Sequence, residues 1–284
     1  MKRNDQEIQG GDNSQNYQAN GDINVNGLTY EQVEKLFMTM FKANFYDLQE
    51  EAKEVAEKRA EEITLKYINK LSEETIDVLD NTRDPDIRFD IYEVQKAYAR
   101  SGDKGLSEIL IALLVERTKN NDNDLVKIVY NEALMSVSKL TNRQIHLMTL
   151  MFITKNLHFD YNSVIQLEDF YNIFLKHFLP NKNSVALKIE DVNYNHINFT
   201  GCSSYTNMQF DFRETLRRKF FNKFSEMEIT EFIQAHEELE RFDALWTVSK
   251  IKQYELTSVG IVIAVSNLEK ILGKNIDAKI WLEN

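Results

Sequence analysis

Proline and glycine are scarce in this chain beyond its first 27 residues, and this scarcity constrains the fold more than any other feature. The 284 residues include two prolines, Pro85 and Pro180, and nine glycines, four of which precede residue 28. Both residue types interrupt helices, because proline lacks an amide hydrogen and glycine loses the most conformational entropy on folding. The chain beyond residue 27 is therefore predicted to form long helices with few sharp turns.

Local signals place the first two helices. A capping box formed by Thr29 and Gln32 predicts a helix start, because each side chain satisfies a free amide of the first turn. The apolar residues that follow are spaced as on one helix face: Val33, Leu36, Phe37, Met40 and Phe41. A strongly charged helix is predicted from Leu48 to about Leu71. Its narrow seam suits either coiled-coil contacts or a solvated helix that lies across its own domain. The residues of the seam are Leu48, Ala52, Val55, Arg59, Ile63 and Tyr67.

Residues 72–85 are predicted to end this charged helix and to form a linker. A compact helical bundle follows, with short polar joints between neighbouring helices. Its helices are predicted at 87–100, 106–117, 125–140 and 141–154, and Gly102 is placed to end the first of them. Another helix ends at Pro180. Residues 193–210 are polar and aromatic without a clear period, so we expect them to be irregular.

The carboxy-terminal segment has a pattern similar to the end of winged-helix domains. Helices are predicted at 212–224 and 226–239, and an apolar–polar alternation follows them. Tyr254 to Thr257 predicts a strand that leads into a helix capped by Thr257, where Gly260 permits close packing in the first turn. The final residues 277–283 alternate and predict an edge strand.

The first 27 residues differ in composition from the rest, being rich in Asn, Gln, Gly, Asp and Ser. Such a segment buries too little apolar surface to offset its ordering entropy alone. Its amides can instead stack with copies of themselves, each backbone pairing with a neighbouring chain. We therefore expect a short β segment that associates copies of the chain, the alternative being a disordered tail. The expected self-association residues are Asn13, Ser14, Asn16, Tyr17, Gln18, Asp22, Ile23 and Val25.

The composition excludes several classes of protein. A net charge of −11 argues against general affinity for nucleic acid or for anionic membranes. The single cysteine, Cys202, excludes an internal disulfide and fits a reducing cytosol. The first residues lack the apolar core of a signal peptide, and no apolar run approaches the ~20 residues that span a bilayer. We expect a cytoplasmic protein.

We predict no catalytic residue, no cofactor and no metal site. The five histidines lack the spacing of metal ligands. Cys202 and nearby His196 are the residue types of a thiol nucleophile, but a small buried thiol is the simpler interpretation. One helix carries a basic face that suits either DNA phosphates or an acidic surface of another subunit. Its residues are Arg213, Arg217, Arg218, Lys219 and Lys223.

Both ends of the chain resemble a widespread group of uncharacterised bacterial proteins. The resemblance rests on GGDNSQNYQANGDINVNGLTYEQV at 10–33, FKANFYDLQEEAKEVAEKRAEEI at 41–63 and LTSVGIVIAVSNLEKILGKNIDAKIWLE at 256–283. The helical layout is more loosely similar to the abortive-infection alpha family, which implies a role in antiphage defence. Tyr17 to Asn20 is similar to the amyloid-forming homotypic motif of necrosome kinases, with Asn20 in place of the motif's glycine.

These patterns predict a mainly α fold. We expect a β self-association segment at 1–27, a charged helical spacer at 28–82, a helical bundle at 83–180, and an irregular region with a winged-helix-like domain at 181–284. The expected function is that of a non-enzymatic homo-oligomer in antiphage defence, triggered by a phage or host protein. The alternatives are a winged-helix DNA-binding regulator and an amyloid-motif signalling adaptor.

Overall fold

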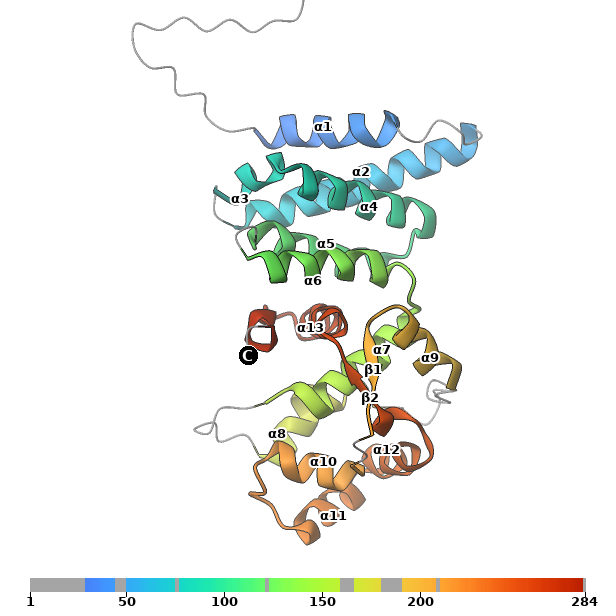
Figure 1. Cartoon of the computed structure of the whole chain (residues 1–284), viewed down its shortest axis with the longest axis vertical. Coiled ribbons are helices and arrows are strands. Elements are labelled where there is room, and N and C mark those ends of the chain that lie inside the picture. The colour runs from blue at the N-terminus through green and yellow to red at the C-terminus, as the bar shows by residue number, and fades with distance from the viewer. Residues whose placement is uncertain are drawn as a thin grey trace, which may run out of the picture.

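A computed structural model describes residues 29–43, 50–74, 77–120, 123–158, 166–179, 191–207 and 210–282. The expected self-association segment, 1–27, lies outside the described residues. Within them the chain is mainly helical, with one pair of short strands (Figure 1). The helices of the first half are α1 (Tyr30–Ala43), α2 (Glu50–Ser72), α3 (Asp77–Asp80), the 3-10 turn η1 (Asn81–Arg83), α4 (Pro85–Ser101), α5 (Lys104–Lys119), α6 (Asp124–Val137) and α7 (Asn142–Met151).

The second half consists of shorter elements. They are the π-helical turn η2 (Phe152–Asn156), α8 (Leu167–Phe170), the π-helical turn η3 (Tyr171–Leu175), α9 (Asp191–Phe199), β1 (Ser203–Tyr205), α10 (Phe212–Lys219), α11 (Glu226–Ala235), α12 (Glu237–Val248), the 3-10 turn η5 (Ile251–Gln253), β2 (Tyr254–Leu256), α13 (Ser258–Leu272) and the 3-10 turn η6 (Ala278–Trp281).

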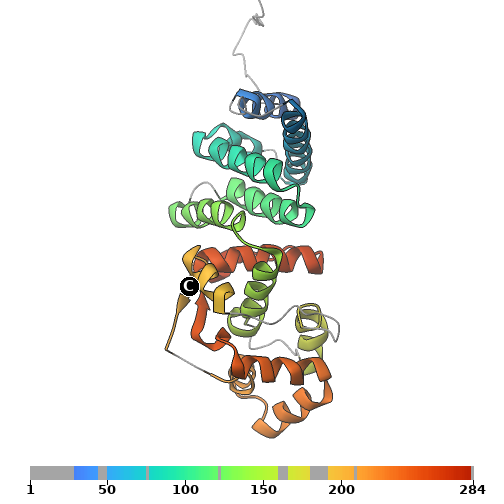
Figure 2. The same cartoon turned by 90° about the vertical axis from the view of Figure 1, so that its right-hand side faces the viewer.

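The helices are stacked in layers along the long axis of the molecule (Figure 1). Helix α1 lies at one end, followed by α2 with α4 and then by α5 with α6. Helix α13 comes next and packs against α5, α6 and α7, so the last long helix lies between the two halves of the chain (Figure 2). One apolar core runs through all these layers, from Val33 in α1 to Ala278 in η6.

Local sequence signals account for several helix ends. The predicted capping box at α1 is confirmed, because the Thr29 amide donates to Gln32 Oε1 at 2.9 Å and the Gln32 amide donates to Thr29 Oγ1 at 3.3 Å. Gly102 ends α4 as predicted, with φ +60°. A side chain at this position would also collide with Arg59, whose guanidinium donates to the Ala99 carbonyl at 3.0 Å.

The charged helix α2 packs within its own domain along its second half. Ile63 and Tyr67 of the predicted seam are buried, and the Tyr67 hydroxyl lies 2.8 Å from Thr118 Oγ1 in α5. Val55, nearer the start of α2, is 50% exposed. The seam therefore serves mainly as an intramolecular contact, since its bulkiest residues lie in the core.

The small sheet joins β1 to the start of α13. Strands β1 and β2 pair antiparallel, with Ser203 opposite Leu256. The predicted transition from strand to helix at Thr257 is confirmed, because Thr257 caps α13 by accepting from the Gly260 amide at 3.3 Å. Gly260 is required by close packing, since a Cβ there would lie 1.9 Å from the Cys202 carbonyl oxygen. This two-stranded sheet and the helix after it do not by themselves show the expected winged-helix domain.

Several local predictions were wrong. Residues 191–199, expected in part to be irregular, form α9. Two of its described side chains, Tyr194 and Ile197, are buried, which is too few to produce a visible period. The linker 72–85 contains α3 and η1. The helix predicted at 226–239 is interrupted at His236, and the first part of the apolar–polar alternation expected after it lies in α12. The expected edge strand at 277–283 is the 3-10 turn η6, which is capped by Asp277 accepting from the Lys279 amide at 3.0 Å.

Candidate functional site

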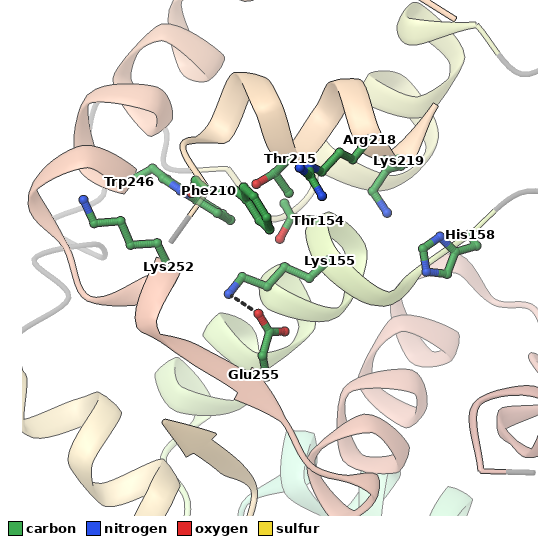
Figure 3. Close-up of a pocket in the computed structure, with 10 residues that line it drawn as sticks. All are labelled: Thr154, Lys155, His158, Phe210, Thr215, Arg218, Lys219, Trp246, Lys252 and Glu255. Atoms are coloured by element: carbon green, nitrogen blue, oxygen red, sulfur yellow. Dashed lines mark hydrogen bonds and ion pairs between the residues drawn. The ribbon is translucent and has the colours of Figure 1, made fainter. Parts of the chain in front are cut away.

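A pocket of about 270 Å³ opens where η2, α10, α12 and the η5–β2 segment meet (Figure 3). We call it the basic pocket, because lysine and arginine side chains from three separate parts of the chain reach it. Its lining residues are Thr154, Lys155, His158, Phe210, Thr215, Arg218, Lys219, Trp246, Lys252 and Glu255.

Lys155 fixes one wall of the basic pocket. It projects from η2, a π-helical turn of the kind that often marks functional sites. Its ammonium group donates to the carbonyls of Ile251 at 2.9 Å and Tyr254 at 2.6 Å, and to Glu255 Oε1 at 3.1 Å. Burial lowers the pKa of Lys155, while Glu255 partly opposes this shift. Because all three ammonium hydrogens have acceptors, Lys155 holds the η5–β2 segment in place and has no donor left for a ligand.

Lys219 is the most unusual group in the pocket. It is the last residue of α10 and is only 3% exposed, and its ammonium group donates to the Leu157 carbonyl. The ammonium also lies 5.6 Å from the centroid of the Phe170 ring. Within the described part of the chain, no carboxylate forms an ion pair with it. Burial alone lowers the pKa of Lys219 to about 7. The pocket therefore contains a buried amine without an acidic partner, an arrangement that native proteins seldom retain.

Two further cations and a histidine complete the lining of the pocket. Arg218 donates from Nε to Glu214 Oε1 at 2.8 Å, and its guanidinium carbon lies 3.9 Å from the centroid of the Phe210 ring. The remaining guanidinium hydrogens can still reach a ligand. Lys252 donates to a backbone carbonyl at 3.4 Å. Burial, together with the nearby charge of Lys219, lowers the pKa of His158.

The charges of the pocket do not cancel. The Lys155 ammonium offsets the Glu255 carboxylate, and Arg217 and Arg218 share the carboxylate of Glu214, which leaves Lys219 and Lys252 as cationic groups without an acidic partner among the described residues. The aromatic side of the pocket is rigid, because the Trp246 indole donates to the Phe210 carbonyl at 2.9 Å. A concave site with excess positive charge and an apolar wall suits a small anionic ligand.

The structure divides the predicted basic face into separate groups. Arg213 pairs with Asp243 at 3.0 Å, and Arg217 pairs with Glu214 at 2.8 Å. The Lys223 ammonium lies 6.0 Å from the centroid of the Phe224 ring. Only Arg218 and Lys219 reach the basic pocket. Sequence reasoning missed the pocket residues at 155, 158 and 246–255, because only the tertiary fold brings them to α10.

A second depression lies between α4 and α6 and has a volume of about 550 Å³. Lys96, Arg100 and Lys139 line it, but Lys96 pairs with Glu93 at 2.5 Å. Arg100 and Lys139 are exposed and lie near the carboxyl ends of their helices, where cations offset the helix dipole. Both side chains are exposed, whereas Lys219 at the carboxyl end of α10 is buried, so we take the basic pocket as the candidate site.

The other candidates from the sequence do not form a reactive site. Cys202 is buried, and burial raises the pKa of its thiol. Gln144 donates from Nε2 to Nδ1 of the His196 ring at 2.9 Å. Within the described residues, no three or more His, Cys, Asp or Glu side chains are grouped so as to hold a metal ion. No helix in that same part of the chain has the length and apolar character needed to cross a bilayer.

Comparison with known proteins gives a family but no described activity. A family model matches residues 27–242 and again residues 213–282, so the matches together cover most of the chain. The chain belongs to an uncharacterised protein family. No curated protein and no solved structure gives a significant match. The match agrees with the expected membership of an uncharacterised group, and the function must be inferred from the geometry of the basic pocket.

Proposed function

We propose that the protein is a non-enzymatic receptor whose basic pocket binds a small ligand that carries a phosphate group. The observation that supports this proposal is the buried ammonium group of Lys219, which lines a pocket and has no acidic partner among the described residues. Removing a charge from water costs several kcal/mol unless an opposite charge compensates for it. An anionic ligand would supply that compensation.

Phosphate suits this pocket better than a carboxylate does. Its oxygens can accept from the planar guanidinium of Arg218 and from the ammonium group of Lys219 at the same time. A phosphate group offers three terminal oxygens to these donors, whereas a carboxylate offers two. The hydroxyls of Thr154 and Thr215 also line the pocket, but each donates its hydrogen to the backbone carbonyl four residues earlier.

Calorimetric titration of the full chain with inorganic phosphate, at constant ionic strength, tests the proposal. We expect one saturable site, and we expect Lys219→Met and Arg218→Met each to weaken binding about tenfold, the usual effect of removing one charge-assisted hydrogen bond. Lys223→Met, near the end of the same helix but outside the pocket, is the matched control and should bind like the parent. Unchanged affinity in both pocket variants would refute the proposal.

The assembly and biological role of this receptor are also proposals. The amide-rich composition of residues 1–27 supports self-association, and the resemblance to the abortive-infection alpha family supports a role in antiphage defence. In this view the segment 1–27 brings copies together, and the body of each copy binds the ligand. Deleting 1–27 should lower the mass measured by multi-angle light scattering while preserving the helical circular dichroism spectrum. An unchanged mass would remove self-association through this segment from the proposal.

A winged-helix DNA-binding regulator is the second candidate. The step from β2 into α13 at Thr257 favours it. The acidic partners of Arg213, Arg217 and Arg218 weigh against it, since they reduce the charge available to phosphates. Salt-dependent binding to duplex DNA that is lost in Arg217→Glu/Arg218→Glu would favour this candidate. The amyloid-motif adaptor concerns Tyr17 to Asn20, outside the described residues.

A further inference from the structure

The two ends of the basic pocket differ in chemistry. Figure 3 shows Lys219 and His158 at one end, and Trp246 with Lys252 at the other. Phe210 projects between them, above the paired Lys155 and Glu255 side chains. A simple spherical anion would use only the first end, so the pocket is longer and more varied than phosphate alone requires.

The Lys219 end is suited to a phosphate group. Lys219 uses one of its ammonium hydrogens for the Leu157 carbonyl, and Arg218 uses its Nε hydrogen for Glu214. Both side chains line the pocket and therefore retain donors that can reach a ligand there. This end provides the positive charge and the hydrogen-bond donors for one phosphate.

The Phe210 side is suited to a planar ring. Phe210 is half-buried, and the Arg218 guanidinium covers one face of its ring at 3.9 Å. Stacked guanidinium and phenyl planes form a flat wall, on which a heteroaromatic ring can stack or lie edge-on. Glu255 lies on the opposite side of the pocket, and its Oε1 atom accepts a hydrogen bond from Lys155. Its Oε2 atom can accept a hydrogen bond from an amino group on such a ring.

The size of the pocket sets the size of this ligand. A volume of about 270 Å³ is at or below the lower end of the range found for small-molecule sites. It suits a ligand no larger than a single nucleotide, and it is far too small for a duplex or for a protein helix. The cations of the pocket are also too few for the many contacts of a nucleic-acid backbone.

We propose that the basic pocket recognises a nucleoside monophosphate with an amino-substituted base, the phosphate at the Lys219 end and the base between Phe210 and Glu255. This inference rests on the proposed phosphate-binding function and adds the class of ligand. The ring contributes stacking energy with Phe210, and its amino group donates to Glu255. Ligands with a phosphate but no base should bind more weakly.

Calorimetric titration of the full chain with four probes tests this inference: AMP, IMP, ribose 5-phosphate and inorganic phosphate. Base stacking on an aromatic side chain typically strengthens binding about tenfold or more, so we expect AMP to bind about tenfold tighter than ribose 5-phosphate. IMP lacks the amino group and should bind more weakly than AMP. Phe210→Leu should weaken AMP binding and leave ribose 5-phosphate binding unchanged, with circular dichroism confirming its fold.

The outcomes separate this inference from the proposed function. If inorganic phosphate binds and Lys219→Met weakens it, but AMP is no tighter than ribose 5-phosphate, the nucleotide inference is wrong and the proposed function stands. If Phe210→Leu weakened the binding of AMP and of ribose 5-phosphate by the same factor, the inference would also be overturned, since the Phe210 ring would then act only through the fold. If none of the four probes binds, both proposals fail.

Discussion

Replacing Lys219 by methionine should stabilise the protein at neutral pH. In the folded protein burial lowers the pKa of Lys219 from 10.5 to about 7, whereas the unfolded chain keeps the ordinary value. Each unit of difference corresponds to about 1.4 kcal/mol, so the penalty for this lysine reaches at most about 5 kcal/mol. Its hydrogen bond to Leu157 and its contact with the Phe170 ring offset part of this penalty. We expect Lys219→Met to gain about 1–3 kcal/mol at pH 7.

The gain should depend on pH in a defined direction. Between pH 7 and 10.5 the unfolded state binds more protons than the folded state, so the parent protein gains stability as the pH rises. Below pH 7 both states hold the proton, and the contribution of Lys219 no longer changes. The advantage of Lys219→Met should therefore be greatest at pH 7 and below, and should shrink as the pH approaches 10. Urea unfolding of both proteins at pH 6, 8 and 10 measures this difference.

Two features make this comparison decisive. Burial raises the pKa of Tyr67 and Tyr130, so both proteins become less stable at high pH, but the effect is common to both and cancels in the difference. Saturating phosphate should restore the charged form of Lys219 and so reduce the advantage of the variant. A constant difference in the free energy of unfolding from pH 6 to 10 would show that folding does not change the pKa of Lys219. Its ammonium group would then not be the desolvated charge without compensation on which the phosphate proposal rests.

Three further substitutions test the packing around the site. Lys155→Met leaves two buried carbonyls without their donor and should lower the free energy of unfolding by about 2–4 kcal/mol, measured in urea. Gly260→Ala places a methyl group 1.9 Å from the Cys202 carbonyl oxygen and should cost about 3 kcal/mol or more, whereas Gly105→Ala, which meets only side-chain ends, should change stability by less than about 1 kcal/mol. Burial raises the pKa of Glu269 to about 7, so its protonated side chain contributes stability that is fully present below pH 4.5 and is lost as the pH rises through 7. Glu269→Gln should therefore lose less stability than the parent over that interval, as measured by thermal unfolding.

The sequence predicted those features of the fold that depend on neighbouring residues. The capping box at Thr29, the left-handed end of α4 at Gly102 and the start of α13 at Thr257 are all set within one helical turn, and all three were confirmed. Helix α9 was missed because its asparagine-rich sequence has low helix propensity, and its contacts with other elements compensate for this. Local signals succeed where the energy is local, and they fail where tertiary packing decides.

The candidate site was predictable only in part for the same reason. The composition of one helix revealed Arg218 and Lys219, yet it gave no sign that one pairs with Glu214 and the other is buried. Lys155 and Lys252 lie far from α10 in sequence, and they meet it only through the path of the chain. A charged residue acquires a binding role from its desolvation and its partners, and neither property is visible from spacing along the chain.

The end of the described chain supports the pocket from behind. Trp281 in η6 donates from its indole nitrogen to the Asn156 carbonyl at 2.9 Å, and its ring meets the Phe152 ring edge-on at a centroid distance of 5.0 Å. Both partners belong to η2, the turn that also presents Thr154 and Lys155 to the pocket. The π-helical turn is thus held by η6 on one side and, through the Lys155 ammonium, by the η5–β2 segment on the other. Because two separate parts of the chain fix the same five-residue turn, the pocket wall is rigid before any ligand arrives, which lowers the entropy cost of binding.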